Sequence, residues 1–175
     1  MASKHEVTDR RRDLSSKVVE LTLRVLALRE KTYPGHGYNW DWTRSAGRLL
    51  CLLNDYYTQF ELSTLLAAEA TYETLLEAVV EAESKVEPLT GERFVGEKNE
   101  RDLIAEKLPE LASRVFALRT QHYKGCGFHW SLVRSIGGLL ELANSRESEI
   151  TLTDSIALEV GYESLVESVT AAESS

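Results

Sequence analysis

The sequence predicts an all-α protein of two homologous helical modules, and three observations point to that class. Residues 15–84 align with residues 105–174 at a constant shift of 90 positions without a gap, and 30 of the 70 aligned pairs are identical. Apolar residues recur at helical spacing in both copies. The alternation typical of half-buried strands is absent apart from short pieces such as Glu149–Thr153. We therefore expect three to four helices in each copy, packed with pseudo-twofold symmetry.

The domain boundaries follow from the repeat. We expect an N-terminal tail or helix start at residues 1–14, a first module at 15–84, a linker at 85–99 and a second module at 100–175. The linker contains a proline, two glycines and mixed charges. A unit of roughly 70 residues buries little apolar surface alone, so we expect the modules to share a core or to pack face to face.

The first helix of each module carries an apolar stripe with steps of four, three, four and three residues. The stripe comprises Leu14, Val18, Leu21, Val25 and Leu28 in the first copy, and Ile104, Leu108, Leu111, Val115 and Leu118 in the second. Pro109 replaces Val19 in the second copy. Because proline is tolerated in the first turn of a helix, we expect the second copy's helix to begin later.

A turn and a second helix follow in each copy. The segments YPGHGYNW and YKGCGFHW contain paired glycines that suit a helix stop and a tight turn. Asp41 and Ser131 are suitable N-caps for the second helix. Inside that helix, Gly47 and Gly137 occupy equivalent positions, where glycine costs about 1 kcal/mol relative to alanine. This cost indicates that another helix approaches closely at both glycines.

The last part of each copy is expected to form a short helix, a corner and a final helix, because Thr71 and Gly161 interrupt it at the same position. One piece of this part, DSIALEVGYES at Asp154–Ser164, resembles the first half of the helix-turn-helix signature of AraC-type transcription regulators. In that family the next helix reads DNA with basic and amide side chains, whereas here it carries Glu167 and Glu173. Since carboxylates repel phosphates, we expect no DNA contact from this segment.

The charge and hydropathy of the chain exclude several function classes. A formal charge of −8 at pH 7 argues against a general nucleic-acid binder, which needs a basic surface. The basic run Arg10–Arg12 is interpreted as part of a helix start or tail, with contact to a phosphate-rich partner as the alternative. No segment reaches the roughly 20 apolar residues that cross a bilayer, and no signal peptide is evident. Cys51 and Cys126 do not align across the repeat, so we expect reduced thiols in a soluble, cytoplasmic protein.

The candidate site for a ligand or partner is the duplicated turn between the first and second helices. Its residues are Tyr33, Tyr38, Trp40 and Arg44 in the first copy, and Tyr123, Phe128, Trp130 and Arg134 in the second. Aromatic rings followed by an arginine in the first turn of a helix could stack a base or hold an anion. The interpretation that we favour is structural: the rings close the core and the arginine pairs with a carboxylate.

Metal binding and catalysis have little support in the sequence. His122, Cys126 and His129 have a spacing that could gather zinc ligands, but the first copy does not repeat the set and a closed site needs a fourth ligand. We therefore expect no metal and no other cofactor. The sequence has no Gly-x-Ser-x-Gly motif and no phosphate-binding glycine loop, so we assign no catalytic residue.

Charged residues are duplicated as well. Glu69 and Glu73, repeated as Glu159 and Glu163, are interpreted as an exposed acidic face. The duplicated arginines are Arg24, Arg29 and Arg44, repeated as Arg114, Arg119 and Arg134. Their expected partners are carboxylates of the chain itself, namely Glu20, Glu69 or Glu73 and the repeats of these.

These observations favour a non-enzymatic protein-interaction protein, an acidic adaptor or inhibitor whose partner is a protein with a basic surface. A small, acidic and internally duplicated chain of this kind suits a phage or mobile-element accessory factor. The alternatives are a small-molecule or nucleotide-binding protein that uses the duplicated turn, and a nucleic-acid-binding regulator. Both a monomer and a homo-oligomer are compatible with the repeat.

Overall fold

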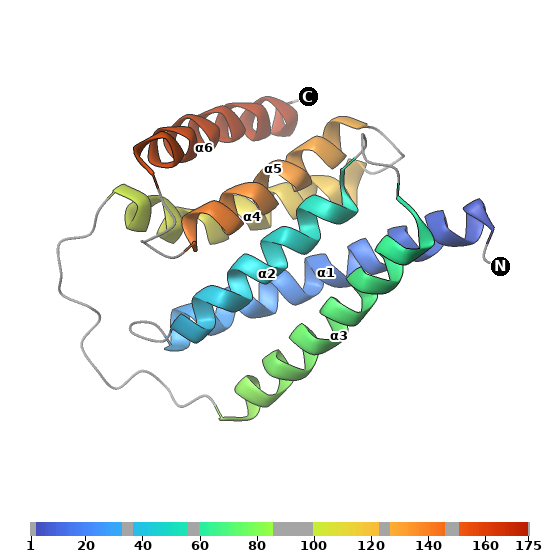
Figure 1. Cartoon of the computed structure of the whole chain (residues 1–175). Coiled ribbons are helices and arrows are strands. Elements are labelled where there is room, and N and C mark those ends of the chain that lie inside the picture. The colour runs from blue at the N-terminus through green and yellow to red at the C-terminus, as the bar shows by residue number, and fades with distance from the viewer. Residues whose placement is uncertain are drawn as a thin grey trace.

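The computed structural model describes residues 3–32, 37–55, 60–85, 100–122, 127–145 and 151–174. Its helices are α1 (Lys4–Thr32), α2 (Gly37–Leu53), α3 (Leu62–Lys85), α4 (Glu100–His122), α5 (Gly127–Ala143) and α6 (Leu152–Glu173) (Figure 1). None of these described residues lies in a strand, so the predicted all-α class is confirmed. The predicted linker lies outside the described residues, apart from Lys85 at the end of α3.

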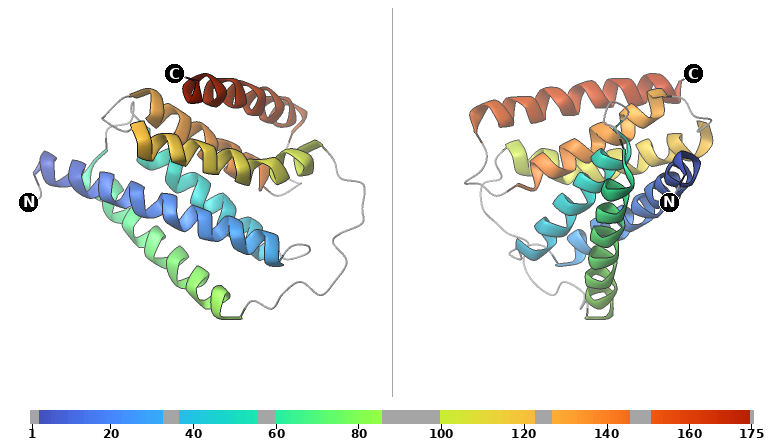
Figure 2. Two further views of the ribbon diagram at one scale, coloured as in Figure 1. Left: turned by 180° about the vertical axis from the view of Figure 1, so that it is seen from behind. Right: turned by 45° about the vertical axis from the view of Figure 1, so that its right-hand side comes forward.

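The helices pack around the crossing of α2 and α5. Helices α1 and α4 cover one side of this central pair, as the view from behind shows (Figure 2). Helix α3 packs on α1 and α2, whereas α6 packs on α4 and α5, so that α3 and α6 lie at opposite ends of the molecule (Figure 1). The outer surfaces of α3 and α6 are consequently far apart.

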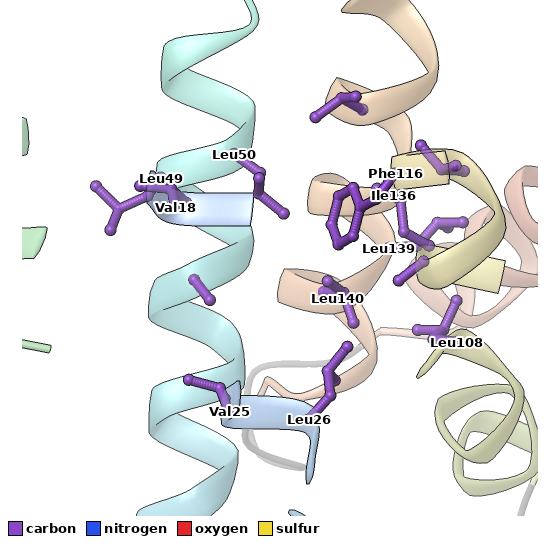
Figure 3. Close-up of a cluster of buried hydrophobic side chains, with 14 of the residues drawn as sticks. Val18, Val25, Leu26, Leu49, Leu50, Leu108, Phe116, Ile136, Leu139 and Leu140 are labelled. Atoms are coloured by element: carbon purple, nitrogen blue, oxygen red, sulfur yellow. The ribbon is translucent and has the colours of Figure 1, made fainter. Parts of the chain in front are cut away.

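A single apolar core runs through both halves of the chain. All ten residues of the two predicted first-helix stripes are buried, which confirms those stripes. Figure 3 shows Leu50 of α2, Phe116 of α4 and Leu140 of α5 among the side chains that gather in this core. Because the core is continuous, neither half buries its apolar residues independently of the other.

The two central helices make their closest approach at Gly47 and Gly137. A Cβ atom added to Gly47 would lie 2.5 Å from the Gly137 carbonyl oxygen and 2.8 Å from the backbone nitrogen of Glu141. A Cβ added to Gly137 would lie 2.8 Å from the Gly47 carbonyl oxygen. Backbone atoms this close leave no room for a side chain, so the predicted approach of another helix at both glycines is confirmed.

Helices α3 and α6 run without interruption, so the predicted corner at Thr71 and Gly161 is wrong. The Thr71 hydroxyl donates a hydrogen bond to the Ala67 carbonyl oxygen at 2.9 Å, a bond that a helix interior accommodates. A Cβ on Gly161 would lie 3.1 Å from Leu139 Cδ2 of α5, so this glycine accommodates a neighbouring helix. Residues Asp154–Ser164 are therefore continuous helix and lack the turn of the helix-turn-helix signature that their sequence resembles.

Several helix starts also differ from the prediction. Helices α2 and α5 begin at Gly37 and Gly127, four residues before Asp41 and Ser131, which lie beyond the first turns. Pro109 stands in the interior of α4 and does not mark its start.

The start of α6 is fixed by a capping box. The Thr151 hydroxyl accepts a hydrogen bond from the Asp154 amide at 3.2 Å, and the Asp154 carboxylate accepts one from the Thr151 amide at 3.0 Å. These bonds lower the pKa of Asp154 below its usual value. Thr151 therefore begins a helix, and the extended character of Glu149–Thr153 in the sequence does not produce a strand in the described part of that segment.

Candidate functional site

The predicted aromatic and arginine turn lies mostly outside what the structure describes. Tyr33 and Tyr123 are outside the described residues. Four further members of the set have described backbones in α2 or α5 but side chains that are outside the description, namely Tyr38, Trp40, Phe128 and Trp130. Arg44 and Arg134 are the members whose side chains are placed.

Both arginines lie next to carboxylates of the chain. Arg44 Nη2 is 2.6 Å from Asp41 Oδ1 within α2, and the Arg44 side chain is 15% exposed. Arg134 Nη1 is 3.7 Å from Asp55 Oδ1, which follows the end of α2 in the other half. Carboxylate partners were expected for these arginines, but the expected residues were glutamates and the observed ones are the aspartates Asp41 and Asp55. The two arginines occupy equivalent sequence positions and yet make different contacts.

The structure brings no metal-binding cluster together within its described residues. Cys126 lies outside them, and the side chains of His122 and His129 are likewise not described. Elsewhere in the described ranges, no group of three or more His, Cys, Asp or Glu side chains could hold a metal ion. Cys51 is a free thiol whose pKa burial raises to about 11, which disfavours the reactive thiolate form.

The basic run Arg10–Arg12 contributes to helix packing. Arg10 Nη2 lies 2.7 Å from Glu69 Oε2, and its Nε donates to Glu69 Oε1 at 3.1 Å, which joins α1 to α3. Arg11 donates to the carbonyl oxygens of Leu53 at 2.9 Å and Asp55 at 2.7 Å, at the C-terminal end of α2. Glu69 is therefore part of an ion pair between helices, which corrects its interpretation as a solvated acid.

Arg101 binds a carbonyl oxygen at the C-terminal end of α5, as Arg11 does at the end of α2. Its Nη1 donates to the carbonyl oxygen of Ser145, which follows the end of α5, at 2.7 Å. Arg11 and Arg101 are 90 positions apart, just outside the aligned segment, so the same shift applied a few residues further would have identified them. The duplicated Arg24 and Arg114 pair with Glu83 and Glu173. These partners differ from the Glu20, Glu69 or Glu73 of the prediction.

The outer surface of α6 carries the most exposed apolar residues of the described chain. Leu152, Ile156 and Val160 are 78%, 53% and 58% exposed and follow each other in steps of four residues. Such spacing places them in one row along the helix. Glu163 and Glu167 continue the row at steps of three and four, and both are exposed. We call these five residues the α6 face: its N-terminal half is apolar and its C-terminal half is acidic.

Helix α3 also exposes two large apolar residues, Leu66 and Val80, but they lie 14 positions apart. Leu66 is 50% exposed, but the position equivalent to Val160 is Ala70. A groove of about 480 Å³ lies between α1 and α3 and is lined by Leu66, Ala70 and the ion pairs Arg10–Glu69 and Lys17–Asp13. An apolar partner surface would have to cover these charges, so α3 is the poorer docking surface.

No helix in the described ranges is both long and apolar enough to cross a membrane. Comparison of the chain with protein-family models, with curated proteins and with solved structures gave no match. The α6 face is thus the strongest candidate site on physical grounds alone.

Proposed function

We propose that the chain is a non-enzymatic protein-interaction protein, an acidic adaptor or inhibitor that binds its partner through the α6 face. The observation that carries the proposal is the row of three large apolar side chains, each more than half exposed, on a single helix. Contiguous exposed apolar residues are typical of protein contact sites. Because each is already partly buried, covering its remaining exposed surface would contribute about 1–2 kcal/mol to binding.

We also propose that the chain consists of two homologous modules related by a pseudo-twofold axis near Gly47 and Gly137. Three reciprocal features support this arrangement. Each of the two glycines faces the other's carbonyl oxygen. The ion pairs Arg24–Glu83 and Arg114–Glu173 join equivalent helices. Finally, Arg11 and Arg101 bind carbonyl oxygens at the ends of equivalent helices.

This equivalence extends the proposed docking surface onto α4. Asp13 lines the α1–α3 groove together with Leu66 and Ala70. The residue equivalent to Asp13 is Leu103, which is 44% exposed. Leu103 would then adjoin Ile156 and Val160, so the second module presents apolar residues where the first presents a carboxylate and an alanine.

The proposal is tested by affinity purification from native extract with three forms of the full chain. The wild type is compared with the double variant Ile156→Ser/Val160→Ser and with the matched variant Leu66→Ser/Ala70→Ser on α3. All substituted residues are partly or fully exposed, so the three forms should give the same helical circular dichroism.

We expect a protein to co-purify with the wild type and with the α3 variant, and to be lost from the α6 variant. Retention of every co-purifying protein by the α6 variant would show that this face is not the binding site. Loss from both variants would show that binding does not distinguish the two modules.

A further inference from the structure

Resting on the proposed function, we propose that the partner segment seated on the α6 face is an amphipathic helix with an apolar stripe and lysine or arginine residues at one end. The length of the α6 face sets the length of the partner helix. From Leu152 to Val160 the apolar half is about 12 Å long, and from Val160 to Glu167 the acidic half adds about 10 Å. A partner helix of about 15 residues spans both halves.

The acidic half of the face determines the charge of the partner. Neither Glu163 nor Glu167 has an ion-pair partner within 4 Å among the described residues. On the neighbouring helix α4, Lys107 Nζ lies over the Tyr162 ring at 5.8 Å from the centroid, and Arg114 donates to the Thr170 hydroxyl. A basic end on the partner would complement the two carboxylates, which favours encounter and fixes the orientation of the bound helix.

Charge also argues against two other occupants. A second copy of the chain carries the same net charge of −8. If two α6 faces pair in parallel, the glutamates of one copy meet those of the other. If they pair antiparallel through their apolar halves, the α6 face of the second copy offers no lysine or arginine to the glutamates. An anionic lipid surface would repel Glu163 and Glu167. A basic amphipathic helix is the occupant that satisfies both halves of the face.

The first module supplies the control for this argument. Glu73 and Glu77 of α3 are the equivalents of Glu163 and Glu167 and are also exposed. The row before them has one large exposed apolar residue, Leu66, since Leu62 is half-buried and Ala70 is small. If general attraction between a basic peptide and an acidic protein accounted for binding, both pairs of glutamates would contribute equally.

The test uses three synthetic helical peptides of equal length titrated into the full chain by fluorescence anisotropy at low salt. The first peptide has a leucine stripe followed by lysines, the second has the same stripe followed by glutamates, and the third has lysines but serines in place of the leucines. The protein forms are wild type, Glu163→Lys/Glu167→Lys, Ile156→Ser/Val160→Ser, and the matched control Glu73→Lys/Glu77→Lys.

We expect the wild type to bind the leucine–lysine peptide about tenfold more tightly than the leucine–glutamate peptide, as two favourable ion pairs would give. Glu163→Lys/Glu167→Lys should reverse that preference, whereas the control of identical net charge should keep it. Ile156→Ser/Val160→Ser, or serines in the peptide stripe, should weaken binding about a hundredfold because apolar contacts are lost.

Any of the following results would overturn the inference: equal affinity for the two leucine peptides, an identical response of the two lysine variants, or sedimentation showing a dimer that Ile156→Ser/Val160→Ser abolishes. Binding of anionic vesicles through the α6 face would also overturn it. If the peptides fail but a protein from native extract still depends on Ile156 and Val160, the basic helix is wrong and the proposed function stands. If no protein depends on these residues, the proposed function itself fails.

Discussion

Helices α3 and α6 stand at equivalent positions of the sequence repeat but present different surfaces to solvent. Arg10 and Glu69 tie α3 to α1. The equivalent positions in the second half are Glu100 and Glu159, two acids that cannot form such an ion pair with each other. The second half instead has exposed Leu103 on α4 and exposed Val160 on α6. The ion pairs Arg24–Glu83 and Arg114–Glu173 match in the two halves, whereas the outer faces of α3 and α6 differ, and this difference locates the proposed binding surface.

The crossing of α2 and α5 at Gly47 and Gly137 joins the two halves, and breaking it should have the largest effect. Gly47→Val places a side chain against backbone atoms of α5, which cannot move aside as a flexible side chain can. We expect the free energy of unfolding to fall by about 3 kcal/mol or more.

The measurement is urea unfolding followed by circular dichroism, with Gly138→Ala as the control. A Cβ on Gly138 would meet only Cys51 Sγ within 4 Å, at an ordinary contact distance of 3.7 Å. This control should therefore raise the free energy of unfolding by about 0.5–1 kcal/mol through helix propensity. Equal stability of Gly47→Val and the wild type would contradict the close crossing.

The next effect concerns the arginine bonds at the ends of α2 and α5. Arg11→Ala removes hydrogen bonds to two carbonyl oxygens, and Arg101→Ala removes the equivalent bond of the second half. We expect each substitution to cost about 1–3 kcal/mol, since it leaves partly buried carbonyl groups without these donors.

Thermal unfolding of the two variants, with Arg12→Ala as the control, checks this expectation. Arg12 is exposed, so its removal should change stability by less than about 0.5 kcal/mol. If Arg12→Ala lowered the stability as much as Arg11→Ala does, the basic run would act through its general charge and not through these hydrogen bonds.

The smallest effect is expected at the ion pair between α4 and α6. The Arg114 guanidinium lowers the pKa of Glu173 below its usual value. A carboxyl group whose pKa is lower in the folded state stabilises the fold above its unfolded pKa of about 4.3, and this contribution is lost as the pH falls below that value.

Melting temperatures of the wild type and Glu173→Gln from pH 3 to pH 7 provide the measurement. The wild type should be slightly more stable at pH 7, the difference should shrink toward pH 3, and 1 M salt should reduce it, because the pair is partly exposed. A difference that grows as the pH falls would have the wrong sign for this mechanism.

The sequence predicted the parts of the fold that depend on local spacing. The first-helix stripes were found because their apolar residues recur at steps of four and three residues in both copies. The crossing at Gly47 and Gly137 was found because a helical glycine is costly and the cost appears twice. Thr71 and Gly161 were misread because the same residues that break isolated helices are tolerated where a hydroxyl bonds within the helix or a neighbour packs closely.

The α6 face could not be found from the sequence because α6 is apolar on more than one side. Leu158 and Leu165 are buried, whereas Ile156 and Val160 are exposed, and no difference in residue type distinguishes the two rows. Only the packing of α6 on α4 and α5 decides which row meets solvent. The ion pairs between helices, such as Arg24 with Glu83, likewise require the register of two helices that are far apart in sequence.

Amide hydrogen exchange of the full chain, with and without the protein that co-purifies with it, tests the central claim most directly. If the α6 face is the binding surface, partner binding should slow exchange across residues 152–167 and leave the equivalent residues 62–77 of α3 unchanged. Protection confined to α3, or to the turns between α1 and α2 and between α4 and α5, would contradict the assignment of the binding site to α6.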